Sequence, residues 1–331
     1  MKNYVKISLF FLFTVHVVYS QNFTISGYIK DRSNGESAVG TTVFIKELNK
    51  ATSANQYGFY SITVSKGQYT VVFSYMGYET WSQTIDLNKN IALNINLKPS
   101  EKQLDEVVVV TDKPDQNVKS SQMGSVVLDI AEIKKIPAFM GEVDVLKTIQ
   151  LLPGVKSAGD GNSGFYVRGG GPDQNLVLLD EAPVYNASHL MGFFSVFNGD
   201  AVKNVTLIKG GMPAQYGGRL SAVLDISMKE GNNQKFHVTG GIGVIASRLT
   251  IEGPIKKDRS SFMISMRRTY IDVIIKPFFK AGSPFAGTSY FFYDLNTKFN
   301  YRFSDKDRIF FSAYFGRDIF RFNDVEADFN T

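Results

Sequence analysis

Residues 290–322 read YFFYDLNTKFNYRFSDKDRIFFSAYFGRDIFRF, and this stretch decides the fold. It predicts two strands, residues 290–303 and 308–322, joined by the short polar turn Ser304–Asp307. One face of the first strand is mainly apolar and the other is polar: Tyr293, Leu295, Thr297, Phe299 and Tyr301 against Asp294, Asn296, Lys298 and Asn300. Such alternation over about ten residues is typical of a transmembrane β-barrel, although a soluble β-sandwich gives the same pattern.

Three further strands are predicted before this stretch, at residues 236–245, 247–255 and 261–271. Five strands cannot close a barrel, and an open sheet in lipid leaves unpaired backbone groups at its edges. We therefore expect residues 233–331 to form the first strands of a barrel, and the sequence to be a fragment of a longer chain or an interrupted reading frame.

Residues 124–229 carry a mixed α/β pattern. A short helix is predicted after the capping residue Asp129 and before Pro137. A second helix is predicted from an apolar stripe that follows two acidic residues in the first turn: Val145, Leu146, Ile149 and Leu152, after Glu142 and Asp144. Strands are predicted at residues 165–168, 175–180, 205–209 and 222–228.

Residues 21–98 contain short alternating runs separated by turn signals, at residues 23–29, 41–45 and 69–75. In the last run Tyr69, Val71, Phe73 and Tyr75 share one face, which we expect to be core. The pattern predicts a small antiparallel β-sandwich.

Within this region, ATSANQYGFYSITVSKGQYTVVFSYMGYET (residues 51–80) resembles the carboxypeptidase-regulatory-like domain, a transthyretin-like sandwich. The resemblance covers most of residues 22–98, and Gly58 and Gly67 stand where that family turns between strands. No histidine lies between Gln21 and Pro99, so the imidazole ligands of a carboxypeptidase zinc site are absent from this region.

Four ordered segments resemble the plug domain of TonB-dependent receptors: DVLKTIQLLPGV (144–155), GFYVRGGGPDQNLVLLDEAPVYN (164–186), HLMGFFSVFN (189–198) and VTLIKGGMPAQYGGRLSAVLDI (205–226). Each segment alone is weakly specific. Their order, after a regulatory-like domain and before a barrel-like region, is what identifies the family. The resemblance implies a plug domain over residues 114–232.

Residues 99–113 form a polar linker that contains one extended apolar run, LDEVVVV: Leu104, Asp105, Glu106, Val107, Val108, Val109 and Val110. Composition alone favours an ordinary buried strand. Its position just before the plug implies the family's TonB box, an extended peptide that binds the energy transducer TonB. An unpaired strand can bind by adding to the edge of another protein's sheet.

Within the plug-like region, a set of glycine-rich and charged positions forms our candidate plug motif: Arg168, Gly169, Gly170, Asp180, Gly210, Gly211, Tyr216, Gly217, Gly218 and Arg219. We expect these glycines to permit tight turns and close backbone approach. Arg168 and Arg219 are expected to pair with carboxylates such as Asp180 or Asp225. A phosphate loop is disfavoured because the Gly-Lys-Ser/Thr ending is missing.

Neither catalysis nor nucleic-acid binding has a recognisable motif. His189 and His237 are the only histidines after residue 20, and neither lies in a catalytic motif. We therefore expect no catalytic residue, cofactor or metal site. Without Lys2 and Lys6, 34 basic residues face 31 acidic ones, and no basic run of five occurs. The chain therefore lacks the electrostatic footprint of a nucleic-acid-binding protein.

Residues 1–20 predict a signal peptide, because two lysines precede an apolar run of about 18 Å that is too short to span a bilayer. Cleavage is expected after Ser20. The chain contains no cysteine, which excludes disulfides and a lipidated cysteine.

The sequence thus predicts a mainly β protein with a sandwich, a mixed α/β plug and an incomplete barrel. The resemblance implies a bacterial outer-membrane receptor whose N-terminal domain and plug face the periplasm. Such a receptor imports a siderophore, oligosaccharide or peptide by proton-gradient-driven remodelling of the plug. Its expected partners are TonB, outer-membrane lipid and a surface lipoprotein. The alternatives are a surface adhesin or glycan-binding module and a periplasmic peptidase accessory.

Overall fold

The computed structural model describes residues 21–100, 124–136, 141–159, 162–189, 192–278, 289–304 and 307–321. The chain divides into two compact units, and each is described by itself. The first contains residues 38–97 together with the chain up to Ile29, and the second contains residues 30–37 and 98–331.

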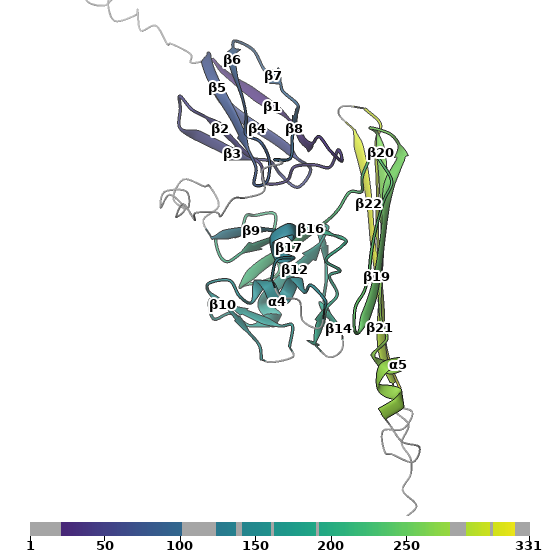
Figure 1. The fold of residues 1–331 in the computed structure, drawn as a ribbon. Coiled ribbons are helices and arrows are strands. Elements are labelled where there is room, and N and C mark those ends of the chain that lie inside the picture. The colour runs from purple at the N-terminus through teal and green to yellow at the C-terminus, as the bar shows by residue number, and fades with distance from the viewer. Residues whose placement is uncertain are drawn as a thin grey trace, which may run out of the picture. The chain divides into compact units, whose positions relative to one another are not determined.

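The first unit is a β-sandwich (Figure 1). One sheet has the order β3-β2-β5-β6: Lys50–Ser53, Thr42–Ile45, Gly67–Ser74 and Trp81–Leu87. The other has the order β4-β1-β7, with β8 also paired to β1: Phe59–Ser65, Asn22–Asp31, Ile91–Ala92 and Ile95–Leu97.

The sandwich has one core, to which both sheets contribute. Tyr69, Val71 and Phe73 are buried on the predicted face of β5, which confirms the period-two pattern. Tyr60 from the opposite sheet meets Phe73 edge to face, with ring centroids 5.2 Å apart. Gly58 has φ of +73° at the turn before β4, a conformation that glycine adopts without steric cost.

The second unit begins with an α/β part built on the sheet β13-β12-β17-β16-β9: Ala182–Pro183, Asn175–Leu179, Ala222–Met228, Val202–Ile208 and Ser125–Asp129. β12 and β17 are parallel, and the other neighbours are antiparallel. Two small hairpins and a 3-10 turn complete it: β10 (Val155–Ser157) with β11 (Phe165–Val167), β14 (Ser188–His189) with β15 (Phe194–Ser195), and η1 (Pro172–Gln174).

The helices of the α/β part are shorter than predicted. α3 spans only Ile130–Ile133, and Asp129 is the last residue of β9. α4 spans Val145–Ile149, and Asp144 is its N-cap: its carboxylate accepts from the backbone N–H groups of Leu146 and Lys147. The placement of Glu142 and Asp144 in the first helical turn was therefore wrong. Among the described residues, no helix is long and apolar enough to cross a membrane.

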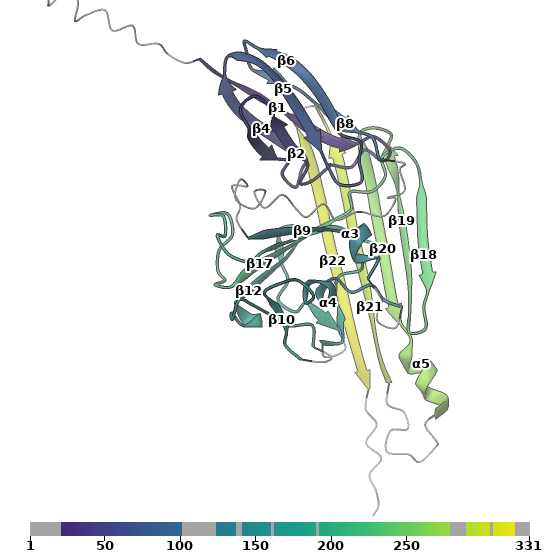
Figure 2. The same ribbon diagram turned by 60° about the vertical axis from the view of Figure 1, so that its left-hand side comes forward.

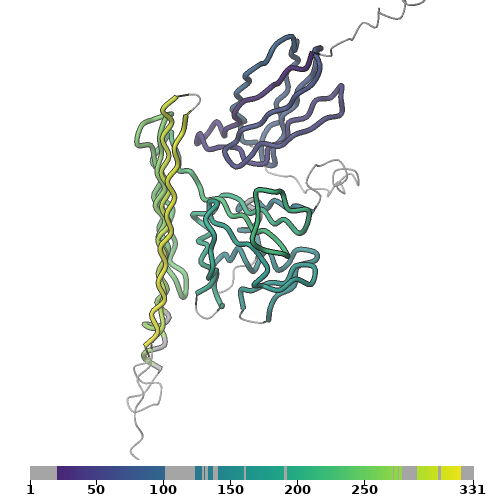
Figure 3. The backbone as a smooth tube through the Cα atoms, turned by 180° about the vertical axis from the view of Figure 1, so that it is seen from behind, coloured from purple at the N-terminus to yellow at the C-terminus, as the bar shows by residue number. Residues whose placement is uncertain are grey.

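The remaining chain forms a long-strand sheet, entirely antiparallel, in the order β18-β19-β20-β21-β22: His237–Ile242, Ala246–Lys256, Ser260–Thr269, Ser289–Arg302 and Arg308–Arg321. Figure 2 shows these strands running side by side, and Figure 3 shows the same sheet edge-on. α5 (Ile271–Ile275) and η3 (Lys276–Phe278) follow β20, so the third predicted strand ends before Ile271.

The burial of the long-strand sheet is the reverse of a soluble sandwich. The predicted polar face of β21 is buried, with Asp294 and Asn296 each only 2% exposed. On β22 the apolar side chains of Ile309, Phe311 and Phe315 are more than half exposed. A soluble sheet would bury its apolar face, so this arrangement is that of a barrel wall, with its apolar side toward lipid.

Candidate functional site

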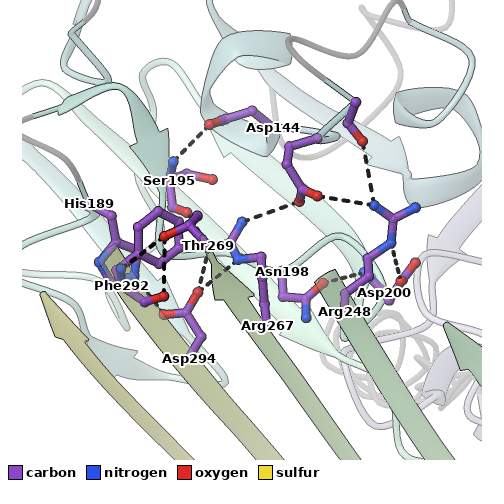
Figure 4. A network of polar contacts seen from close by, with 12 residues as sticks. Asp144, His189, Ser195, Asn198, Asp200, Arg248, Arg267, Thr269, Phe292 and Asp294 are labelled. Carbon is purple, nitrogen blue, oxygen red and sulfur yellow. Dashed lines mark hydrogen bonds and ion pairs between the residues drawn. The ribbon is translucent and has the colours of Figure 1, made fainter. Parts of the chain in front are cut away.

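A buried polar network joins the α/β part to the long-strand sheet (Figure 4). The α/β part contributes five polar side chains: Glu142, Asp144, His189, Asn198 and Asp200. The sheet contributes two arginines and one carboxylate at its centre, namely Arg248, Arg267 and Asp294. Buried charges require partners, so this network decides how firmly the two parts hold together.

Arg267, on β20, is the central cation and is 3% exposed. Its Nε and Nη2 atoms donate to Asp294 Oδ2 over 2.8 and 2.6 Å. The same Nη2 donates to the backbone carbonyl of Ser195 over 2.7 Å, and Nη1 lies 3.9 Å from Glu142 Oε2. One guanidinium thus connects two barrel strands with β15 of the α/β part.

Arg248, on β19, makes a second cross-connection. Its Nε lies 2.7 Å from Asp200 Oδ2, and its Nη1 donates to Glu142 Oε1 over 3.3 Å. Burial raises the pKa of Glu142 despite the neighbouring charges of Arg267 and Arg248. Burial acts the same way on Asp200, but Lys134, at 2.8 Å, together with Arg248 outweighs it and lowers the pKa of that carboxyl.

His189, at the end of β14, is 3% exposed and lies between two carboxylates of the sheet. Its Nε2 lies 2.6 Å from Asp294 Oδ1, and its Nδ1 lies 2.9 Å from Asp318 Oδ2. Its ring stacks on Phe292 with centroids 4.2 Å apart. Sequence reasoning missed this residue, because its partners lie 105 and 129 positions away and no local motif marks it.

Neutral hydrogen bonds and a further ion pair extend the contact. Asn198 Nδ2 donates to Ser265 Oγ over 2.9 Å. Asp180, a residue of the candidate motif, accepts from the Met228 backbone N–H and forms a 2.9 Å ion pair with Lys298 of β21. Asp180 therefore belongs to the polar network. Apolar packing lies beside it: Met263 of β20 packs into the core of the α/β part, and Phe194 of β15 packs against Phe292.

The two candidate arginines do not take the predicted partners in the described part of the chain. Asp180 pairs with Lys298, and Asp225 accepts from the Tyr216 hydroxyl over 2.9 Å. Burial, with a smaller contribution from Asp225, raises the pKa of Tyr216 to about 12, and burial raises the pKa of Asp225. Arg219 donates to the carbonyl of the adjacent Gly218 over 3.1 Å. The predicted pairing with Asp180 or Asp225 was wrong.

Most of the candidate glycines occupy positions that restrict a side chain. Gly169, Gly210, Gly211 and Gly218 have positive φ. A Cβ on Gly170 would lie 2.3 Å from Ser221 Oγ and 2.4 Å from Ser221 Cβ, so the Ser221 side chain leaves no room for a side chain there. Gly217 meets neither condition: its Cβ position has no atom within 4 Å.

The predicted TonB box, Leu104–Val110, lies outside the described residues. Within the described ranges, no group of three or more His, Cys, Asp or Glu side chains could hold a metal ion.

Two family models match the chain. The CarboxypepD_reg-like domain matches residues 25–109, and the TonB-dependent Receptor Plug Domain matches residues 119–223. The TonB-dependent receptor P39 of Formosa agariphila is 34% identical over 102 residues, covering 31% of this chain and 9% of that protein. The ferrienterobactin receptor of Escherichia coli is 28% identical over 148 residues, covering 39% and 19%.

Among solved structures, the siderophore receptor PirA of Pseudomonas aeruginosa is 18% identical, with a TM-score of 0.44, over 61% of this chain and 35% of that one. Together these matches support a TonB-dependent receptor of the outer membrane, and the α/β part matches the plug domain, which faces the periplasm in such receptors. This family consists of receptors and transporters and not of enzymes. The chain spans 9% and 19% of the two curated relatives given above.

Proposed function

We propose that the chain carries the gating part of a receptor that imports a scarce nutrient across the outer membrane. Substrate binds at the cell surface and the TonB box becomes accessible in the periplasm. TonB then uses the inner-membrane proton gradient to displace or remodel the plug.

The observation that carries the proposal is the buried polar network between the plug and the long-strand sheet. Arg267 and Arg248 hold the plug through ion pairs and hydrogen bonds. When a plug moves, polar groups exchange their partners for water, whereas an apolar contact would expose surface that water disfavours. A contact of this kind is firm at rest and can still be broken by a pulling force.

TonB engagement is assigned to Leu104–Val110 from the sequence. The four consecutive valines favour extended backbone, which can add a strand to the edge of a sheet in TonB. Such pairing depends on main-chain hydrogen bonds more than on side chains.

The substrate class is proposed as a siderophore, an oligosaccharide or a peptide. We favour a siderophore among the three, and the name of the Escherichia coli relative, a ferrienterobactin receptor, supports this choice. A plug cavity of about 410 Å³ offers contacts for a polar molecule. It is lined by Asp173, Tyr185 and Arg219, and by Asn175, whose buried Oδ1 has no hydrogen-bond partner.

The experiment is an uptake panel on whole cells that express the full-length receptor, with and without TonB. Labelled ferric siderophores, oligosaccharides and short peptides are offered separately. We expect one class to accumulate only in cells that have both receptor and TonB. Accumulation that is equal without TonB would overturn the proposed mechanism.

A further inference from the structure

The ring of His189 connects a plug hairpin to two different strands of the barrel wall. Asp294 of β21 faces Nε2 at 2.6 Å, and Asp318 of β22 faces Nδ1 at 2.9 Å. The ring is 3% exposed and is stacked on Phe292 at an interplanar angle of 7°. Figure 4 shows His189, Phe292 and Asp294 gathered at one end of the network.

This geometry selects one protonation state. A neutral imidazole has one N–H donor and one lone pair, whereas the imidazolium has two donors. Because an ionised carboxylate only accepts, both short contacts of His189 are satisfied together only when the ring is protonated. Loss of the proton turns one of the two contacts into a repulsion between lone pairs.

Other charged and titratable groups surround the ring, and the Tyr314 hydroxyl lies 3.3 Å from His189 Nε2. Asp294 also binds Arg267 and accepts from the Tyr314 hydroxyl over 3.0 Å. Asp318 accepts from the Tyr290 hydroxyl, and Glu142 lies 3.9 Å beyond, on the far side of Arg267. Arg267 and a protonated His189 balance the charges of the two carboxylates that contact the ring, of which Asp294 is buried and Asp318 is partly exposed. Deprotonation of His189 removes one of the two positive charges beside the buried Asp294.

We propose that His189 is a proton-operated catch that fastens the plug hairpin β14–β15 to the barrel wall and releases it on deprotonation. This catch goes beyond the proposed import function, because it acts whether or not TonB is present. The aqueous pH thereby sets how easily this part of the plug detaches.

The direction of the pH effect follows from the balance at the ring. Burial lowers the pKa of His189, but hydrogen bonds and charge from Asp294 and Asp318 outweigh burial and raise the pKa above 6.5. A raised pKa means that the stabilisation is fully present below the unfolded-state pKa of about 6.5 and is lost as the pH rises through the higher folded-state value. The catch is therefore closed in acid and opens on the alkaline side.

The test is hydrogen exchange on the purified full-length receptor without TonB, at a series of pH values from 6 to 9. The reporters are two amides of the hairpin: Ser195, which donates to Asp144, and Val196, which donates to Ala187. After correction for intrinsic exchange, we expect their protection to fall about tenfold as the pH rises, the equivalent of one charged hydrogen bond. Amides of β16 and β17 should keep their protection.

Two variants test whether titration of His189, and not packing alone, controls the protection of the hairpin amides. His189→Gln keeps a donor but cannot gain charge, so protection should be low at every pH. Asp318→Asn removes one acceptor charge, so the midpoint of the protection loss should move to lower pH. His237→Gln, on an exposed residue of β18, is the matched control and should keep the wild-type profile.

Heat-modifiable migration on gels verifies that each variant folds. A wild-type protection that does not change with pH would overturn the catch. So would a pH dependence that persists unchanged in His189→Gln, or a midpoint that stays in place in Asp318→Asn.

Discussion

Arg267 shows, at the scale of one residue, what holds the plug. Its guanidinium is 3% exposed and connects Asp294 with the carbonyl of Ser195. Removal of one partner from a buried pair leaves the other charge unpaired, which typically costs about 3–5 kcal/mol. Arg267 therefore contributes much of the stability of this contact, because a buried arginine on a barrel strand needs a polar partner.

We predict that Arg267→Ala lowers the free energy of plug unfolding by about 3–5 kcal/mol, because Asp294 keeps only His189 and Tyr314 as partners. Urea titration of the full-length receptor, followed by proteolysis of the plug, measures this. Arg268→Ala is the control: Arg268 is exposed on the same strand, beside Phe291. Equal losses in the two variants would argue against the network.

The alternating residues of β21 show what the sequence could predict at this scale. Asp294 and Asn296 were assigned to the polar face because a strand alternates with period two, and both are buried against the plug. Their partners could not be predicted. A pairing such as His189 with Asp294 spans 105 positions and depends on how two folded parts meet, which local pattern does not encode.

At the scale of elements, Asp144 links a helix to a neighbouring hairpin. One carboxylate oxygen caps α4 through Leu146 and Lys147, and the other accepts from the backbone N–H of Ser195 over 2.7 Å. The cap residue thus fixes α4 and β15 together, close to Arg267.

We predict that Asp144→Ala destabilises the plug by about 1–2 kcal/mol for the lost cap, plus a further cost for the Ser195 amide left without an acceptor. Asp144→Asn should lose less, because an amide oxygen still caps a helix. Thermal unfolding of the plug measures both variants. A loss in Asp144→Asn as large as in Asp144→Ala would indicate that the charge matters and the cap does not.

Gly170 tests the close approach between β11 and the chain after Gly218. We predict that Gly170→Ala destabilises the plug, because the new Cβ would lie 2.3 Å from Ser221 Oγ. Gly217→Ala, where no atom lies within 4 Å, should leave stability within about 0.5 kcal/mol. The comparison uses the same unfolding assay, and a tolerated Gly170→Ala would contradict the contact.

The predicted ends of the long strands were more accurate than those of the first helix, for a physical reason. Long strands such as β21 and β22 were located to within one or two residues, because fourteen residues of alternation give a strong signal. The first helix was overestimated: α3 has only four residues. Asp129 ends β9, where it pairs with Asn204 of β16, and directly precedes α3, so its role as the helix cap stays a prediction.

At the scale of the whole molecule, periodicity and turn signals predicted the sandwich, the mixed α/β region and the barrel strands, and the resemblance of four ordered segments implied that the α/β region is a plug. Cleavage after Ser20, the domain boundaries and the TonB box stay predictions. The contact that holds the plug depends on the burial of the polar face of the long-strand sheet, which local sequence patterns do not predict.

The most direct measurement of the central claim compares two substitutions at Val108 in the full-length receptor. Val108→Pro removes a backbone donor and blocks strand pairing, whereas Val108→Ala keeps the backbone and loses one modest side-chain contact. A paired strand of this length supplies roughly four to six main-chain hydrogen bonds, each worth about 1 kcal/mol net.

Whole-cell uptake and surface binding are measured together, with the substrate class identified by the uptake panel. We expect Val108→Pro to abolish energised uptake and to spare surface binding, while Val108→Ala keeps most of the uptake. Normal uptake by Val108→Pro would contradict TonB engagement by Leu104–Val110. Equal loss in both variants would show that side chains, and not strand addition, mediate recognition.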